Sequence, residues 1–217
     1  MTTDESAVAP VPAPATAPAH ATVYGDPGAA PVLELFEDMR CSYCADLEHD
    51  LGPTMIALAD QGVYRLRYRV ANFLDRGDEQ GPSTSALAAL GAAAEQGAAQ
   101  FLALRTAILA YRRENGSAGL AKQDTLIEIA ARTPGLDLDA LRADLAADRF
   151  RPWALESGAA SLGALKATWA AAEAEGNAGT PAVFLDGKFV ELFTPEDKPV
   201  SPAEFTAGVQ AAAGHGS

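Results

Sequence analysis

The sequence predicts an α/β domain in which a long helical insertion interrupts a small sheet. Three observations predict it. Residues 32–36 form an apolar run that leads directly into a C-x-x-C motif and a helical pattern, which is typical of a buried strand before a helix. Within residues 63–70, arginines alternate with apolar or aromatic side chains, as is typical of a strand. After a long helical stretch, residues 181–190 have the pattern of a β-hairpin.

Length and composition place the chain among globular proteins. Its 217 residues, 48% of them hydrophobic, suffice for one sizeable domain. The formal net charge of −13 argues against nucleic-acid binding, which needs a basic surface. No run of about 18 apolar residues is present, so we expect no membrane-spanning segment in this sequence.

The first residues differ in composition from the rest. Alanine alternates with four prolines between residues 10 and 18, so we predict a disordered Ala/Pro-rich tail over residues 1–22 and a folded domain over 23–215. The N-terminus lacks the basic and apolar regions of a signal peptide, which favours a cytoplasmic protein as the sequence stands. The alternative is an extracytoplasmic or membrane-anchored protein whose upstream segment is missing, because such spacers often follow an anchor.

The first helix follows from hydrophobic periodicity. After the first strand, apolar residues keep a helical stripe over residues 42–61. Ser42 is suited to cap this helix, Pro53 is expected to kink it, and Gly62 is expected to end it.

A charged residue on the first strand predicts a specific ion pair. Glu34 lies in a strand that we expect helices to cover on both sides, so its carboxylate needs a partner. The second strand should be its neighbour, and it places Arg65, Arg67 and Arg69 on one face. We therefore predict that Glu34 pairs with one of these arginines. The alternative is that the arginine face is solvated.

The insertion, over about residues 83–176, is predicted to be helical. We expect a long Ala-rich helix over residues 83–113, shorter helices over 124–131 and 138–147, and a long helix over 152–175. Trp153 and Trp169 lie on the last of these and are expected to pack within the insertion rather than form a binding site.

The end of the chain carries clear turn and helix signals. Asp186-Gly187 is the dipeptide of a type I′ turn and lies between two runs of strand-forming residues, so it predicts the hairpin. Ser201-Pro202 opens the final helix, with proline in the first helical position.

The motif Cys41-Ser42-Tyr43-Cys44 contains the only two cysteines of the chain. A thiol at the start of a helix is exposed to unpaired N–H groups and to the positive end of the helix dipole, which stabilise a thiolate. A second thiol one turn later packs against the helix and is placed to attack a mixed disulfide. We therefore predict Cys41 as the nucleophile and Cys44 as the resolving thiol.

Three other interpretations of the motif remain open at this point. A zinc site needs about four ligands, and His20, His49 and His215 are scattered along the sequence, so we expect no metal. An inert disulfide would close a very small loop and add little stability. Two reduced and buried cysteines without a function are the third alternative. Redox exchange at the motif needs no organic cofactor, and we expect none.

Gly179-Thr180-Pro181 precedes the predicted hairpin. A cis bond at Pro181 would leave the backbone groups of Thr180 free to pair with an extended peptide. The alternative is an ordinary trans proline at the start of a strand.

Six short motifs follow one another along the chain: Tyr24-Gly25-Asp26-Pro27, Ala30-Pro31-Val32, Glu37-Asp38, the C-x-x-C, Phe73-Leu74-Asp75 and Gly179-Thr180-Pro181. In this order they resemble the DsbA-like branch of the thioredoxin superfamily, in particular a bacterial group with a helical insertion. The resemblance covers nearly all of residues 23–213 and implies a thioredoxin-like fold whose insertion lies between the second strand and a cis-Pro strand. It also implies a cis bond at Pro181, with substrate thiols or disulfides docking beside it.

The chain departs from the family pattern at two positions. The family usually has proline after the first cysteine, where this chain has Ser42. It often has a carboxylate that acts in proton transfer six residues before that cysteine, where this chain has Leu35. Either the local register differs, or Glu37, Asp38 or water takes over proton transfer, or the role is absent. We therefore expect a weaker oxidant than the strongest family members, and a potential of about −120 mV would contradict this.

The predicted function is thiol–disulfide exchange with protein substrates. Cys41 and Cys44 would be catalytic, while Ser42, Tyr43, Thr180 and Pro181 would contact the substrate, although Tyr43 could equally lean on the protein's own surface. A redox partner must recycle the cysteine pair, and the direction of exchange stays open. The alternatives are a peptide-binding module without catalysis and a small-thiol-dependent isomerase or transferase of the same superfamily.

Overall fold

The computed structural model describes residues 20–26, 28 and 31–214. Its sheet has the strand order β1-β3-β2-β4-β5, in which β2 and β3 are parallel and the other neighbours are antiparallel. The strands are β1 (Thr22–Tyr24), β2 (Val32–Asp38), β3 (Arg65–Ala71), β4 (Ala182–Leu185) and β5 (Lys188–Val190).

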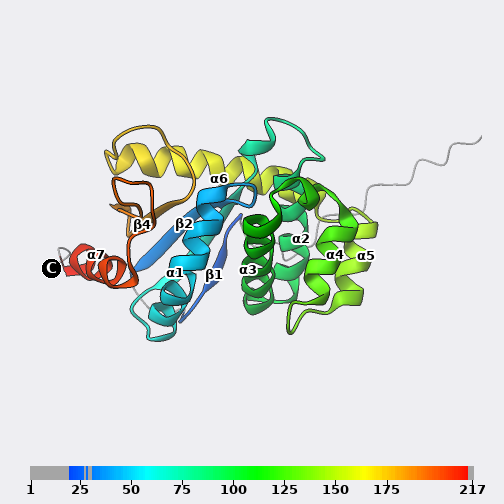
Figure 1. Ribbon diagram of the computed structural model, residues 1–217, viewed down its shortest axis with the longest axis horizontal. Coiled ribbons are helices and arrows are strands. Elements are labelled where there is room, and N and C mark those ends of the chain that lie inside the picture. The colour runs from blue at the N-terminus through cyan, green and yellow to red at the C-terminus, as the bar shows by residue number, and fades with distance from the viewer. Residues whose placement is uncertain (1–19, 27, 29–30, 215–217) are drawn as a thin grey trace, which may run out of the picture.

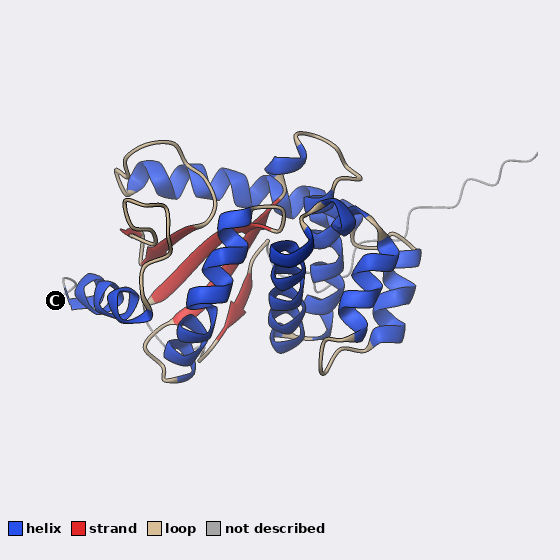
Figure 2. Ribbon diagram, viewed as in Figure 1, coloured by secondary structure: helices blue, strands red, loops and turns tan. Residues whose placement is uncertain are grey.

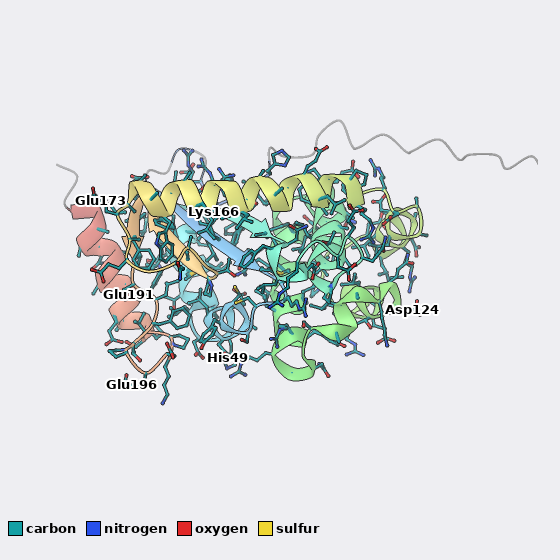
Figure 3. The ribbon with its side chains drawn as sticks, turned by 90° about the horizontal axis from the view of Figure 1, so that it is seen from above. His49, Asp124, Lys166, Glu173, Glu191 and Glu196 are labelled. Carbon is teal, nitrogen blue, oxygen red and sulfur yellow. The ribbon has the colours of Figure 1, made fainter. Side chains whose placement is uncertain are left out.

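Helices cover both faces of this sheet (Figure 1). Helices α1 (Ser42–Asp60) and α7 (Pro202–Gly214) pack on the face that buries Leu33 and Leu35 of β2. Helix α6 (Arg151–Ala171) packs on the other face, where Phe36 is buried. Figure 3 shows α6 along one side of the sheet and α1 along the other, with Lys166 of α6 at the outer surface. Side chains alternate between the two layers because successive strand residues point to opposite faces.

The remaining helices form a separate block beside the β1 edge of the sheet (Figures 1 and 2). The prediction of one helix over residues 83–113 is wrong. The helix is interrupted at Gly97, whose φ of +145° favours glycine. The helices of the block are α2 (Pro82–Gln96), α3 (Ala98–Asn115), α4 (Gln123–Ala131) and α5 (Leu138–Ala146), with 3₁₀ turns η1 (Phe73–Asp75) and η2 (Ala118–Ala121).

Helix α6 joins the block to the sheet. At its start Trp153 packs within the block, edge-on to Phe150, as predicted. Trp169 at its other end packs instead against Phe184 and Phe189 of the sheet, so the prediction that it packs within the insertion is wrong. The bounds of the insertion remain a prediction, because α6 contacts both parts of the fold.

Three boundaries differ from the sequence prediction. Strand β1 was not expected and begins at Thr22, one residue before the predicted start of the domain. Strand β2 runs on to Asp38 because it pairs with β3 over its whole length. Ser42 does not cap α1, since Cys41 is the N-cap residue and Ser42 is the first helical residue. Residues 1–19 of the predicted tail, and His215, lie outside the described residues.

The predicted hairpin and ion pair are confirmed. Asp186 and Gly187 both have positive φ, +46° and +80°, as a type I′ turn requires. Glu34 accepts a hydrogen bond from Arg69 Nε at 2.6 Å, and Arg67 Nη1 lies 3.5 Å away. The pairing follows from the parallel register of β2 and β3, which places Glu34 opposite Arg67.

In the described part of the chain, we find no helix whose length and apolar character would allow it to cross a membrane.

Candidate active site

Cys41 lies at the junction between β2 and α1. Its N–H donates to Asp38 O at 2.9 Å, which closes a tight turn, and its φ and ψ of −68° and 127° are extended, as at an N-cap. Its thiol is therefore held at the end of α1 where backbone N–H groups are unpaired. Cys44 lies one turn into the helix. Both thiols are free, and they are 8% and 1% exposed.

The segment around Pro181 lies directly against this helix end. The Thr180–Pro181 bond is cis, which confirms the expectation from the resemblance. The Cys41 thiol donates to Thr180 O at 3.2 Å, although 139 residues separate the two in sequence. The structure thus brings together two motifs that the sequence predicted to meet.

The two thiols have opposite acidities. The pKa of Cys41 is lowered to about 7, chiefly by a hydrogen bond from the Cys44 thiol, against the opposing effect of burial. The N–H groups of Tyr43 and Cys44 and a side-chain hydrogen bond with Thr180 lower it further. Burial raises the pKa of Cys44 well above its ordinary value, and the neighbouring charges of Cys41 and Glu37 add to this effect. Near neutral pH, the pair can therefore hold one thiolate and one thiol.

A buried ion-pair cluster lies behind Cys44. Arg105 of α3, which is 1% exposed, donates to both oxygens of Glu37 at 2.5 and 2.6 Å. It also donates to Glu48 of α1 at 2.5 Å, and its guanidinium lies 4.7 Å from the ring centroid of Tyr68. Burial raises the pKa of Glu37, while the charge and hydrogen bonds of Arg105 oppose this shift. The helical block thus supplies the cation that pairs with Glu37, the carboxylate whose charge acts on Cys44.

Comparison with known proteins agrees with this geometry. A family model described as thioredoxin matches residues 18–211. The chain belongs to the thioredoxin family. No curated protein sequence matches it.

Solved structures similar to this thioredoxin-family chain share the same fold. MdbA, a thiol-disulfide oxidoreductase from Corynebacterium diphtheriae, has a TM-score of 0.69 at 21% identity, over 88% of this chain and 89% of its own. MdbA from Actinomyces oris has a TM-score of 0.66 at 22% identity, over 88% and 85%. Reduced DsbA from Mycobacterium tuberculosis has a TM-score of 0.60 at 21% identity, over 91% and 100%. The predicted DsbA-like thioredoxin fold with a helical insertion is confirmed.

In this thioredoxin-family site, Asp38 fixes the turn before Cys41. Its carboxylate, fully buried, accepts hydrogen bonds from Arg40 N at 2.9 Å, Leu74 N at 3.1 Å and Ser83 Oγ at 2.6 Å. Burial raises its pKa to about 6, although these hydrogen bonds oppose the shift. Asp38 therefore ties the turn to η1 and to the start of α2.

The two residues between the cysteines face outward. Ser42 is exposed, and Tyr43 is 46% exposed while its ring packs edge-on to Phe193 at 5.7 Å. Tyr43 thus leans on the protein's own surface and still presents one side to solvent. Its contact with a substrate peptide stays a prediction.

Sequence reasoning missed Arg105, whose position carried a usable signal. Arg105 interrupts the apolar run of α3 between Leu104 and Ile108, both of which are buried. A single arginine on the apolar face of a helix needs a buried carboxylate. Among the residues that the structure describes, no three His, Cys, Asp or Glu side chains gather as a metal site would require.

Proposed function

We propose that this protein is a thiol–disulfide oxidoreductase that acts on protein substrates. The observation that carries the proposal is the asymmetric thiol pair, in which Cys41 has a lowered pKa and lies 3.2 Å from the carbonyl of Thr180. The similarity in fold to the two MdbA proteins, which are thiol-disulfide oxidoreductases, supports it.

The exchange proceeds in two steps. A substrate thiolate attacks Cys41 of the disulfide form, the bond between Cys41 and Cys44 breaks, and Cys44 leaves as a thiolate that takes up a proton. A second substrate thiolate then attacks the substrate sulfur of the mixed disulfide and releases Cys41 as a thiolate. The substrate loses two electrons and the cysteine pair gains them. In the reverse sequence the Cys41 thiolate attacks a substrate disulfide and releases one substrate thiolate. Cys44 then loses its proton and attacks Cys41 of the mixed disulfide, which releases the second substrate thiolate.

Thr180, Pro181, Ser42 and Tyr43 are proposed to contact the substrate. The Thr180 carbonyl lies beside Cys41 and would pair with an extended chain once the Cys41 thiol no longer donates to it, and the outer side of Tyr43 offers apolar area.

Glu37 is proposed as the proton-transfer group for Cys44. Its charge acts on the pKa of Cys44, whereas the Asp38 carboxylate is engaged by three hydrogen bonds from the turn, η1 and α2. Burial raises the pKa of this carboxyl, which favours the protonated form that a proton-transfer group must be able to adopt.

The direction of exchange depends on the compartment and on the partner that recycles the cysteines. In an oxidising compartment we expect an oxidase, and in the cytoplasm a reductase. The reduction potential, measured against glutathione, distinguishes the two.

The proposal is tested by alkylation and exchange assays on the reduced protein. The rate at which iodoacetamide alkylates Cys41 should rise with pH and inflect near the pKa of about 7. In Cys44→Ala the inflection should move upward towards the ordinary thiol value of about 8.5, because the hydrogen bond that lowers the Cys41 pKa most is gone. The disulfide form should oxidise a reduced model protein, and Cys41→Ser should abolish this activity.

An inflection near 8.5 in the unaltered protein, together with absence of exchange, would instead support a peptide-binding module without catalysis.

A further inference from the structure

A pocket of about 640 Å³ lies beside Cys41. Its lining includes Cys41, Ser42 and the side chains of Arg40, Arg76 and Arg112, and it does not include Thr180 or Pro181. The pocket therefore borders the reactive sulfur on a side that the cis-proline segment leaves open. We call it the arginine pocket.

The three arginines come from separate parts of the fold. Arg40 belongs to the turn before Cys41, and its Nη1 donates to Leu74 O at 2.8 Å. Arg112 belongs to α3, and its Nε donates to Arg40 O at 2.7 Å. Arg76 follows η1 and is exposed. These backbone contacts fix two of the guanidinium groups and leave most of their N–H donors available.

The charges in the pocket are poorly balanced by the protein itself. Asp75 is the carboxylate nearest to these arginines, 3.6 Å from Arg40 Nη1. Its two oxygens already accept hydrogen bonds from the N–H groups of Ser83 and Thr84, at 3.0 and 2.7 Å. Among the described residues, Arg76 has no side-chain hydrogen bond or ion pair.

Three cations therefore face one carboxylate that is engaged elsewhere, in a chain whose formal net charge is −13. A local excess of arginine on an acidic protein favours an anionic ligand at this place and disfavours it elsewhere on the surface. Guanidinium groups are also well matched to carboxylates, because they can donate two parallel hydrogen bonds.

We propose that the arginine pocket binds an acidic side chain close to the reacting cysteine of the substrate. This inference rests on the proposed function and adds a substrate class to it. In the first exchange step the substrate sulfur bonds to Cys41 Sγ and the thiolate of Cys44 leaves. The pocket orients the substrate for that step through an aspartate or glutamate beside its cysteine, and takes no part in the electron transfer.

The test compares single-cysteine peptides that differ in one position. Each peptide carries Glu, Gln or Lys next to its cysteine, and a fourth carries Gln there and Glu eight residues away. The disulfide form of the protein is mixed with each peptide, the reaction is quenched with acid, and mass spectrometry gives the second-order rate constant for the mixed disulfide.

The variants are Arg76→Gln, Arg76→Glu and Arg76→Lys, because the Arg76 side chain is exposed and makes no hydrogen bond or ion pair with the residues that the structure describes. Arg142→Gln on α5 is the matched control, since its side chain is 48% exposed and it lies outside the pocket. The effect is the ratio of the rate constants for the adjacent-Glu and Gln peptides, compared between proteins. The acidity of each peptide thiol cancels in this comparison, because the same peptides react with every variant.

We expect Arg76→Gln to lower this ratio about threefold and Arg76→Glu to lower it about tenfold, as loss or reversal of a partly exposed charge contact would. Arg76→Lys should retain most of the ratio, and Arg142→Gln should leave it unchanged. The peptide with the distant Glu should respond to none of the variants.

Two results would overturn the inference. The first is that Arg76→Glu leaves the ratio of the rate constants for the adjacent-Glu and Gln peptides unchanged. The second is that the rate constants for the adjacent-Glu and distant-Glu peptides, each relative to the Gln peptide, fall equally, which would indicate a general electrostatic effect of the protein's charge. In both cases a normal rate with the Gln peptide would leave the proposed function intact. Absence of reaction with every peptide would overturn the proposed function and this inference with it.

Discussion

At the scale of single residues, the environment of each thiol determines its part in the site. Cys41 is at the end of a helix, with backbone N–H groups and the Cys44 thiol directed at its sulfur, so its negative charge is stabilised. Cys44 is completely buried, one turn further on, where a charge would lose its hydration. Glu37 is also buried and adds a negative charge near Cys44, which raises the pKa of that thiol further.

Glu37→Gln should separate proton transfer by Glu37 from the structural contribution of the ion pair. The glutamine keeps the size of the side chain but holds no proton that it can exchange. We expect the exchange rate at pH 7 to fall on the order of 100-fold. We also expect the free energy of unfolding to fall by roughly 3 kcal/mol, because Arg105 loses one of two buried carboxylates.

Glu48→Gln is the matched control for this change. It removes the other carboxylate from Arg105, and denaturant unfolding should show a stability loss of similar order. The exchange rate should stay within about twofold, because Glu37 keeps its position near Cys44. Equal slowing in both variants would show that Glu37 acts only by supporting the structure.

At the scale of elements, the sequence predicted best where one periodicity extends over many residues. The alternation in residues 63–70 identified both faces of β3, and the Asp186-Gly187 turn identified the hairpin. Strand β1 was missed because three residues are too few to show a period. The break between α2 and α3 was missed because Ala-rich helical patterns continue on both sides of Gly97.

Gly97→Ala should destabilise the protein by about 1–2 kcal/mol, because the residue that joins α2 to α3 has a φ of +145°. Gly163→Ala is the contrasting control. Gly163 lies inside α6, and a Cβ there would meet no atom of the described residues within 4 Å beyond its own stretch of helix, so alanine should stabilise the protein by about 0.5–1 kcal/mol. Urea unfolding measures both changes. If Gly97→Ala does not lower the free energy of unfolding relative to Gly163→Ala, the backbone requirement at the helix junction is contradicted.

At the scale of the whole molecule, the helical block does more than lie beside the sheet. It supplies Arg105 to the buried cluster and Arg112 to the arginine pocket, both from α3. The sequence could predict the two halves of the thiol site, because each is a local motif whose order resembles a known family. It could not predict the arginine pocket, because residues 40, 76 and 112 meet only through the packing of a turn, η1 and α3.

The reduction potential of the whole protein should follow the titration of this site. Closing the disulfide releases two electrons and, below the pKa of Cys41 at about 7, two protons. Because a tenfold change in equilibrium constant corresponds to about 30 mV for two electrons, the potential should become more negative by about 60 mV per pH unit below pH 7. Above pH 7, Cys41 is a thiolate and only Cys44, with its raised pKa, still holds a proton, so the slope should fall to about 30 mV per unit.

The value at pH 7 should also be moderate. Thioredoxin, whose reactive thiol has a pKa of about 7, has a potential of about −270 mV, whereas DsbA, with a pKa of about 3.5, has about −120 mV. Since the Cys41 pKa of about 7 matches that of thioredoxin, we expect a potential closer to about −270 mV than to about −120 mV. Equilibration with glutathione redox buffers between pH 5 and 9 measures both quantities. A constant slope across this range would contradict the lowered pKa of Cys41, and a potential near −120 mV would show that groups other than this thiol stabilise the reduced protein.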